Sequence, residues 1–176
     1  MATQNPVDQE GTYPLPEAQV DRFMLKIFVD YPTKKEELEI MQRMADPTFG
    51  SDINPILSKE DIFAIREAIN DVKTSSEIEE YIVELVFATR FPAKYGLDKY
   101  ADYVTFGASP RATINLIRGA KALAFFDNRE YVTPQDVKDI AYDVFNHRIL
   151  LNFEAEADGI STKEVIETIL KKVAIN

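Results

Sequence analysis

The sequence predicts a mostly α-helical protein, a helical bundle preceded by an N-terminal loop and one strand. Six segments join a helix-start signal to apolar residues at helical spacing. Only residues 23–30, FMLKIFVD, have the length and composition of a strand, and no comparable run follows them. Because 45% of the 176 residues are apolar, the chain can bury a sizeable core, and most of it is not intrinsically disordered.

The first 31 residues differ from those that follow. Turn-forming residues crowd Asn5–Pro14, so this stretch is predicted to be a loop. A single strand at Phe23–Asp30 would not be stable by itself, because its backbone groups need neighbouring strands. We therefore expect two parts, residues 1–31 and a helical domain at residues 32–176. The first 30 residues are expected to be tethered loosely or to pair with another chain.

Ser or Thr, which cap helices well, stands at the start of each predicted helix, and two starts have proline at the first helical position. The six predicted helices begin at Thr33, Ser58, Ser76, Ser109, Thr133 and Ser161. Their inward faces are predicted to carry Ile62, Ile65, Ile69 and Val72, then Ile78, Ile82, Leu85 and Val86, and finally Val165, Ile166, Ile169, Leu170 and Val173. Between helices we expect loops at Asp46–Pro55 and Pro92–Gly107, and a small ribbon pairing Tyr131-Val132 with Leu151–Phe153.

Composition excludes several classes of function. The 30 acidic residues outnumber the 20 Lys and Arg, and this net charge of −10 argues against nucleic acid as the main partner. The absence of Cys and the single His make disulfides, thiolate metal sites and His-rich zinc sites improbable. No apolar run is long enough to span a membrane. We therefore expect an acidic, cytoplasmic protein with no membrane span.

Arg111 is the most informative candidate functional residue, because it lies in the first turn of a predicted helix. A cation there opposes the helix dipole, at a cost of roughly 0.3–1 kcal/mol when it is unpaired. The effect reverses if an anion binds, since backbone N–H groups and the guanidinium then converge on it. The alternative, equally weighted, is that Arg111 reaches solvent or pairs with a nearby carboxylate.

Two further candidates, Asn5 and Arg22, can each be explained without a function when taken alone. Asn5-Pro6 is a turn signal, and Arg22 could form a surface ion pair with Asp21. His147 is expected to be a helix-end histidine without a function. None of the six glycines has the spacing G-x-x-x-x-G-K-[ST], so no phosphate-binding P-loop is present, and no active site is complete within this chain.

Longer motifs carry more information than these single residues. The run ATQNPVDQEGTYPLPEAQVDRF, followed by FVDYP, resembles the second half of a MoxR-type AAA+ ATPase. GASPRAT, YVTPQDV and HRILL with FEAEADGIS resemble the helical lid of the same family. The resemblance covers essentially the whole chain. It implies that residues 1–31 are the C-terminal remnant of the α/β P-loop core and that residues 32–176 are the all-helical lid domain.

The resemblance also implies roles for the three candidates. Asn5 matches sensor 1, which orients the attacking water, and Arg22 matches the arginine finger, which reaches the nucleotide of a neighbouring subunit. Arg111 matches sensor 2, a lid arginine that contacts phosphate. ATP and Mg²⁺ are then cofactors of the full-length parent. Because the P-loop and the metal-binding acids have no match in this sequence, the isolated chain is predicted to be inactive.

In this family the parent would assemble as a ring, expected to be a hexamer, and remodel a protein client in a chaperone-like role. A protein with a von Willebrand A-type domain is one expected partner. The alternative is a stand-alone helical module for protein interaction that has no ATPase activity. A helicase lid acting on DNA is disfavoured by the charge of −10.

Overall fold

The computed structural model describes residues 1–3, 15–45 and 54–175. The chain is mostly helical, which confirms the predicted fold class, and it divides into two compact units. One unit comprises residues 1–26 together with 68–176, and the other comprises residues 27–67. The boundary predicted near residue 31 stays a prediction.

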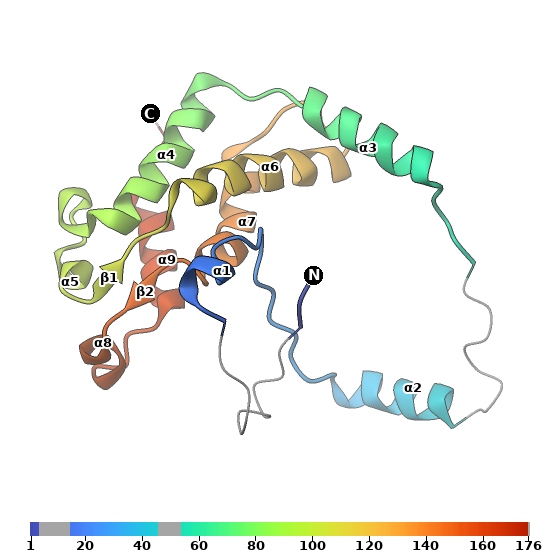
Figure 1. The fold of residues 1–176 in the computed structure, drawn as a ribbon, viewed down its shortest axis with the longest axis horizontal. Coiled ribbons are helices and arrows are strands. Elements are labelled where there is room, and N and C mark those ends of the chain that lie inside the picture. The colour runs from blue at the N-terminus through green and yellow to red at the C-terminus, as the bar shows by residue number, and fades with distance from the viewer. Residues whose placement is uncertain (4–14, 46–53, 176) are drawn as a thin grey trace. The chain divides into compact units, whose positions relative to one another are not determined.

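Four helices form the core of the larger unit (Figure 1). They are α4 (Ser76–Arg90), α6 (Pro110–Phe126), α7 (Pro134–Phe145) and α9 (Thr162–Lys172). Helix α6 packs against α4 and α7, and α9 contacts the same two helices. The core therefore lies between these helices, as expected for a bundle whose members each bury one apolar stripe.

The apolar faces predicted for α4 and α9 are largely buried. Ile82 and Leu85 of α4 and Ile169 of α9 are almost fully enclosed. On α6 a row at a spacing of four residues is fully buried: Ala112, Leu116, Ala120 and Ala124. Gly119, next to this row, allows a close approach to α7, because a Cβ atom there would lie 2.6 Å from Ile140 Cγ1.

Short elements occupy the connections that the sequence leaves irregular. Between α4 and α6 lie the 3-10 helix η1 (Pro92–Tyr95), α5 (Asp98–Ala101) and strand β1 (Val104–Phe106), and after α7 lie β2 (Leu150–Leu151) and α8 (Phe153–Ala157). The predicted ribbon is wrong in one partner, because β2 pairs antiparallel with β1, with Val104 opposite Leu151. Tyr131 instead forms an isolated parallel bridge with Lys73.

The unit at residues 27–67 contains α2 (Lys34–Met44) and most of α3 (Lys59–Asp71), both at predicted positions. Each begins with reciprocal capping bonds, from Thr33 and Glu36 in α2 and from Ser58 and Asp61 in α3. None of the residues of these two fully described helices is buried, although Ile62 is on the face predicted to point inward. The loop predicted at Asp46–Pro55 lies mostly outside the described residues.

One prediction near the N-terminus and one at a helix cap need correction. Residues 23–30, all of them described, form no strand. The backbone there has no partner strand, and the N–H of Lys26 instead donates to the carbonyl of Asp143 at the end of α7. A short helix, α1 (Glu17–Val20), precedes this segment. The cap of α4 is Ser75, one residue earlier than predicted, because its hydroxyl accepts from the N–H of Ile78.

Candidate functional site at the first turn of α6

Packing against α4 places the first turn of α6. Ser109 is the N-cap of the helix, and Pro110 occupies the first helical position, as predicted. Just before it, a Cβ atom on Gly107 would lie 2.5 Å from the carbonyl oxygen of Thr89, so only glycine fits this approach to α4. The Thr89 hydroxyl accepts from the N–H of Ala108 at 2.9 Å and donates to the carbonyl of Val86. These contacts fix the position from which the Arg111 side chain extends.

Arg111 is paired with a carboxylate, which is the alternative that the sequence left open. Its Nη1 donates to Asp21 Oδ2 at 2.6 Å, and its side chain is 53% exposed. The other two guanidinium nitrogens have no recorded hydrogen bond to the described residues. The Asp21 carboxylate thus occupies the place beside the helix N-terminus where an external anion was one of the two alternatives, and about half of the Arg111 side chain stays exposed.

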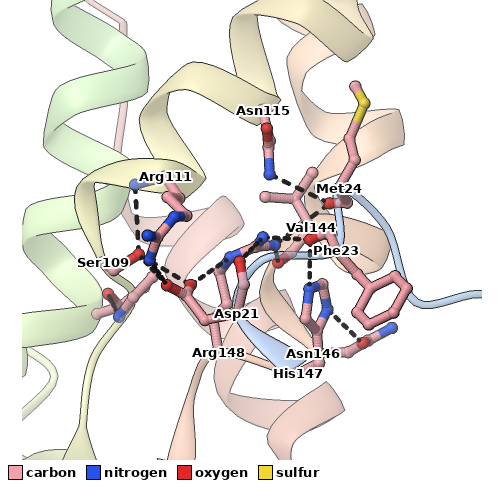
Figure 2. A network of polar contacts seen from close by, with 12 residues as sticks. Asp21, Phe23, Met24, Ser109, Arg111, Asn115, Val144, Asn146, His147 and Arg148 are labelled. Carbon is pink, nitrogen blue, oxygen red and sulfur yellow. Dashed lines mark hydrogen bonds and ion pairs between the residues drawn. The ribbon is translucent and has the colours of Figure 1, made fainter. Parts of the chain in front are cut away.

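Asp21 joins this helix start to the end of α7. Its carboxylate accepts hydrogen bonds from the Ser109 hydroxyl, from Arg111 and from Arg148 Nε at 3.0 Å (Figure 2). Burial alone would raise the pKa of Asp21, but these hydrogen bonds outweigh burial and hold the pKa below its ordinary value. The ion pair suggested between Asp21 and Arg22 is therefore wrong, because Asp21 is bound to two other arginines.

Arg148 is the most buried charge of the network, with a side chain that is 1% exposed. Besides Asp21 Oδ1, its guanidinium donates to four backbone carbonyls, those of Asp21, Phe23, Met24 and Val144. Burial lowers the pKa of Arg148, and Asp21 opposes that effect. A buried guanidinium is stable only when its donors are satisfied, and this one is fully supplied with acceptors.

Residues 21–26, which we call the anchor segment, are therefore held on the bundle. The ring of His147 contributes as well, with Nε2 placed 3.2 Å from the carbonyl oxygen of Phe23. Asn146 donates to the Lys26 carbonyl and Asn115 to the Met24 carbonyl. The expectation that the first 30 residues are only loosely tethered is thus wrong for this segment. His147 is a satisfied helix-end histidine, as predicted.

The three predicted site residues are not all brought together. Asn5 lies outside the described residues. Arg22 is exposed, and its side chain makes no recorded hydrogen bond or ion pair to the described part of the chain. It adjoins Asp21, which contacts Arg111, so two of the three candidates are linked through one carboxylate.

Sequence reasoning missed Asp21 as a bridging residue, and it missed Arg148 altogether. One signal for Arg148 was present, because this single arginine follows a predicted helix and is followed by three apolar residues, RILL. Such a cation is a candidate for burial with a partner. The partner itself lies 127 positions away in the sequence and could not be deduced from local pattern.

Comparisons with known proteins assign this chain to a family. Residues 1–25 match the ATPase family associated with various cellular activities (AAA), and residues 100–169 match the AAA lid domain. The chain is 44% identical over 175 residues to the Chaperone MoxR1 of Mycobacterium tuberculosis, which covers 99% of the chain and 46% of that protein. The present chain belongs to the MoxR-type AAA+ ATPases.

Further relatives agree with this membership. Protein MoxR of Paracoccus denitrificans is 32% identical, over 86% of this chain and 48% of that protein. A crystal structure of a Cytophaga hutchinsonii protein, provisionally described as an ATPase, superimposes with a TM-score of 0.94 at 61% identity and covers 98% of this chain and 52% of that one. The chain thus spans about half the length of the MoxR-type relatives that it matches.

The described residues bring no metal-binding group together, and Arg111 at the start of α6 is partly exposed and paired with Asp21. The side chain of Arg111 is about half exposed, and two of its guanidinium nitrogens, which are the kind of donor that binds phosphate oxygens, have no recorded bond to the described residues. The described ranges bring no three His, Asp or Glu side chains together in a way that would hold a metal ion. None of the helices in these ranges combines the length and apolar character needed to cross a membrane.

Proposed function

We propose that the protein carrying this chain is an ATPase that works as a ring of subunits and remodels protein clients, with this chain supplying the lid and two arginines of the nucleotide site. Arg111 acts as sensor 2 and contacts phosphate of the nucleotide. Arg22 acts as the arginine finger on the nucleotide of the neighbouring subunit, and Asn5 acts as sensor 1.

One observation carries the proposal: Arg111 extends from the first turn of α6 with about half of its side chain exposed. The carboxylate already bound to Nη1 supports the view that the place favours an oxygen anion. ATP, when bound, supplies the phosphoryl group for transfer to water. The part of this chain would be to hold phosphate oxygens through Arg111 and, from the adjoining subunit, to bring the exposed Arg22 to the developing negative charge.

No step is assigned to Mg²⁺, since the described residues provide no group of ligands for it. The metal, like the P-loop, is proposed to be held by other segments of the full-length protein. This chain has no P-loop sequence and is therefore proposed to be inactive by itself.

The experiment is steady-state ATP hydrolysis by the full-length protein. Arg22→Ala should lower kcat by on the order of 10³-fold, as expected for loss of an arginine finger, and Arg111→Ala should mainly weaken nucleotide binding. Arg118→Ala is the matched control, because Arg118 is an exposed arginine on the same helix as Arg111 with no recorded contact to the described residues. Unchanged turnover in the Arg22 and Arg111 variants would reject the assignment.

Assembly and client are proposed on the family alone. A hexameric ring, a chaperone-like role and a partner with a von Willebrand A-type domain all fit a protein of this branch, one of whose members is named a chaperone. Mixed rings give the test of assembly: inactive subunits that retain Arg22 should restore hydrolysis by Arg22→Ala subunits, because the finger acts across the subunit boundary. Failure of this rescue would favour the alternative of a module for protein interaction.

A further inference from the structure

The guanidinium of Arg148 has five N–H donors and five recorded hydrogen bonds. Nε binds Asp21 Oδ1, Nη1 binds the carbonyls of Met24 and Val144, and Nη2 binds the carbonyls of Asp21 and Phe23. The distances lie between 2.5 and 3.3 Å. Since arginine has no further donor, the group is fully committed, and four of its five bonds go to the anchor segment.

These four bonds surround Arg22 without touching it. The carbonyls of Asp21 and Phe23, the residues on either side of Arg22, both accept from Nη2 of Arg148. The main chain is therefore held immediately before and after Arg22, while its side chain is exposed and has no recorded partner among the described residues. Because the backbone is fixed, the long side chain can place its guanidinium only within a limited volume. A residue that must bring a charge to a site in another subunit needs this restriction.

We propose that Arg148 is the positioning residue for Arg22, so that the arginine finger is fixed to the helical lid. This inference rests on the proposed role of Arg22. The end of α7 supports the same segment through His147, Asn146 and the N–H of Lys26. Asp21 adds a link to Arg111, so that one carboxylate connects Arg111 with the backbone that carries Arg22.

The first test uses the 176-residue chain and needs no nucleotide. Hydrogen exchange at the amide of Lys26 should accelerate at least about tenfold in Arg148→Met, while amides of α4 and α9 keep their relative protection. Arg129→Met is the matched control, because Arg129 also makes a paired contact with a carboxylate, that of Asp136, at a site away from the anchor segment. Equal protection of Lys26 in the wild type and in Arg148→Met would overturn the proposal.

The second test uses the full-length protein and measures the kinetic parameters separately. Arg148→Met should lower kcat by on the order of 10²-fold and leave the affinity for the fluorescent nucleotide mant-ADP within about twofold, because the residue acts through Arg22 and not on the nucleotide. The double variant with Arg22→Ala should lose no more than Arg22→Ala alone, since both changes remove the same interaction. Arg129→Met should retain its kcat.

Arg148→Lys is a second, more conservative variant that keeps the test valid if Arg148→Met does not fold. Lysine keeps the charge and most of the buried stem, but a single ammonium cannot reproduce the forked set of bonds. We expect its kcat to stay well below that of the wild type. Wild-type turnover in a folded Arg148 variant would overturn the proposal while leaving the role of Arg22 intact. Wild-type turnover in Arg22→Ala would instead reject the proposed function on which it rests.

Discussion

At the scale of single residues, His147 is the side chain from which we expect a dependence of stability on pH close to neutrality. The ring is enclosed near Asp21, Lys26 and Arg148, and it contacts the carbonyl of Phe23. Burial is the main reason that its pKa is lowered, and the charges of Arg148 and Lys26 add to the effect. As the only histidine of the chain, it is the side chain whose ordinary pKa lies nearest to neutral pH.

We expect the free energy of unfolding to fall as the pH drops below about 7. The unfolded chain takes up a proton at the ordinary pKa of about 6.5, whereas the folded chain does so only at lower pH. The contribution of His147 to stability is therefore complete above the pKa of the unfolded chain. It decreases as the pH falls from there toward the pKa of the folded chain. Urea titrations between pH 5 and 8 measure this slope, and His147→Gln should flatten it. The same slope in that variant would contradict the prediction.

The residues of the site illustrate what a sequence can and cannot predict at this scale. The position of Arg111 in a first helical turn follows from the Ser109-Pro110 signal, which is local. Its partner Asp21 is 90 positions away, and the burial of Arg148 depends on carbonyls from the other end of the chain. Contacts of this kind arise from tertiary packing, and no spacing rule encodes them.

At the scale of elements, two helices start with the same motif in different surroundings. Thr133 and Asp136 form a capping box at α7, where Asp136 is buried and also bound by Arg129. Thr33 and Glu36 form the same box at α2, where both side chains are exposed. The two boxes therefore provide a matched pair in which the local bonds are alike and the packing differs.

We expect Thr133→Ala to lower the free energy of unfolding of the bundle by about 1 kcal/mol, the usual effect of losing an N-cap. Thr33→Ala should lower hydrogen-exchange protection only within α2, because that helix buries none of its residues. Denaturant titrations of both variants, read beside exchange rates in α2, separate the two effects. Equal global destabilisation by the two substitutions would show that the difference in packing is irrelevant.

The junction between β1 and α6 gives a second prediction at this scale. Gly107→Ala would place a Cβ atom against the backbone of Thr89 and Arg90, which cannot move without shifting α4. We expect a loss of roughly 1–3 kcal/mol in the free energy of unfolding. Gly119→Ala is the comparison, because its new Cβ would meet a side chain, that of Ile140, and not the backbone. Thermal unfolding should rank Gly107→Ala as the more destabilising variant.

Helix caps explain why the longer elements could be predicted and the shorter ones could not. Ser109, Thr133 and Ser161 all cap the helices that their sequences signal. The four-residue helices α1 and α5 have no side-chain cap bond, and their formation depends on the surrounding chain. The strand predicted at residues 23–30 has the right composition, but a strand forms only where a partner offers hydrogen bonds.

At the scale of the whole molecule, stability is distributed unevenly between the two compact units. The bundle helices enclose a core that includes Leu85, Phe145 and Ile169, whereas α2 and α3 bury no residue. We expect native-state hydrogen exchange to show the amides of α2 opening at a much lower free energy than those of α4 and α6. Protection of α2 equal to that of α4, in protein verified to be monomeric, would contradict this expectation.

The bond between Asp21 and Arg148 also has a consequence for the order of folding. It closes a loop between residues 127 positions apart, whereas α6 and α7, which pack together, are consecutive helices. Closing a long loop costs more chain entropy than pairing neighbours, so the anchor segment should dock after the bundle has formed. Contacts made after the transition state leave the folding rate unchanged and slow unfolding. Arg148→Met should therefore shorten the lifetime of the folded chain in stopped-flow unfolding, while refolding proceeds at the wild-type rate.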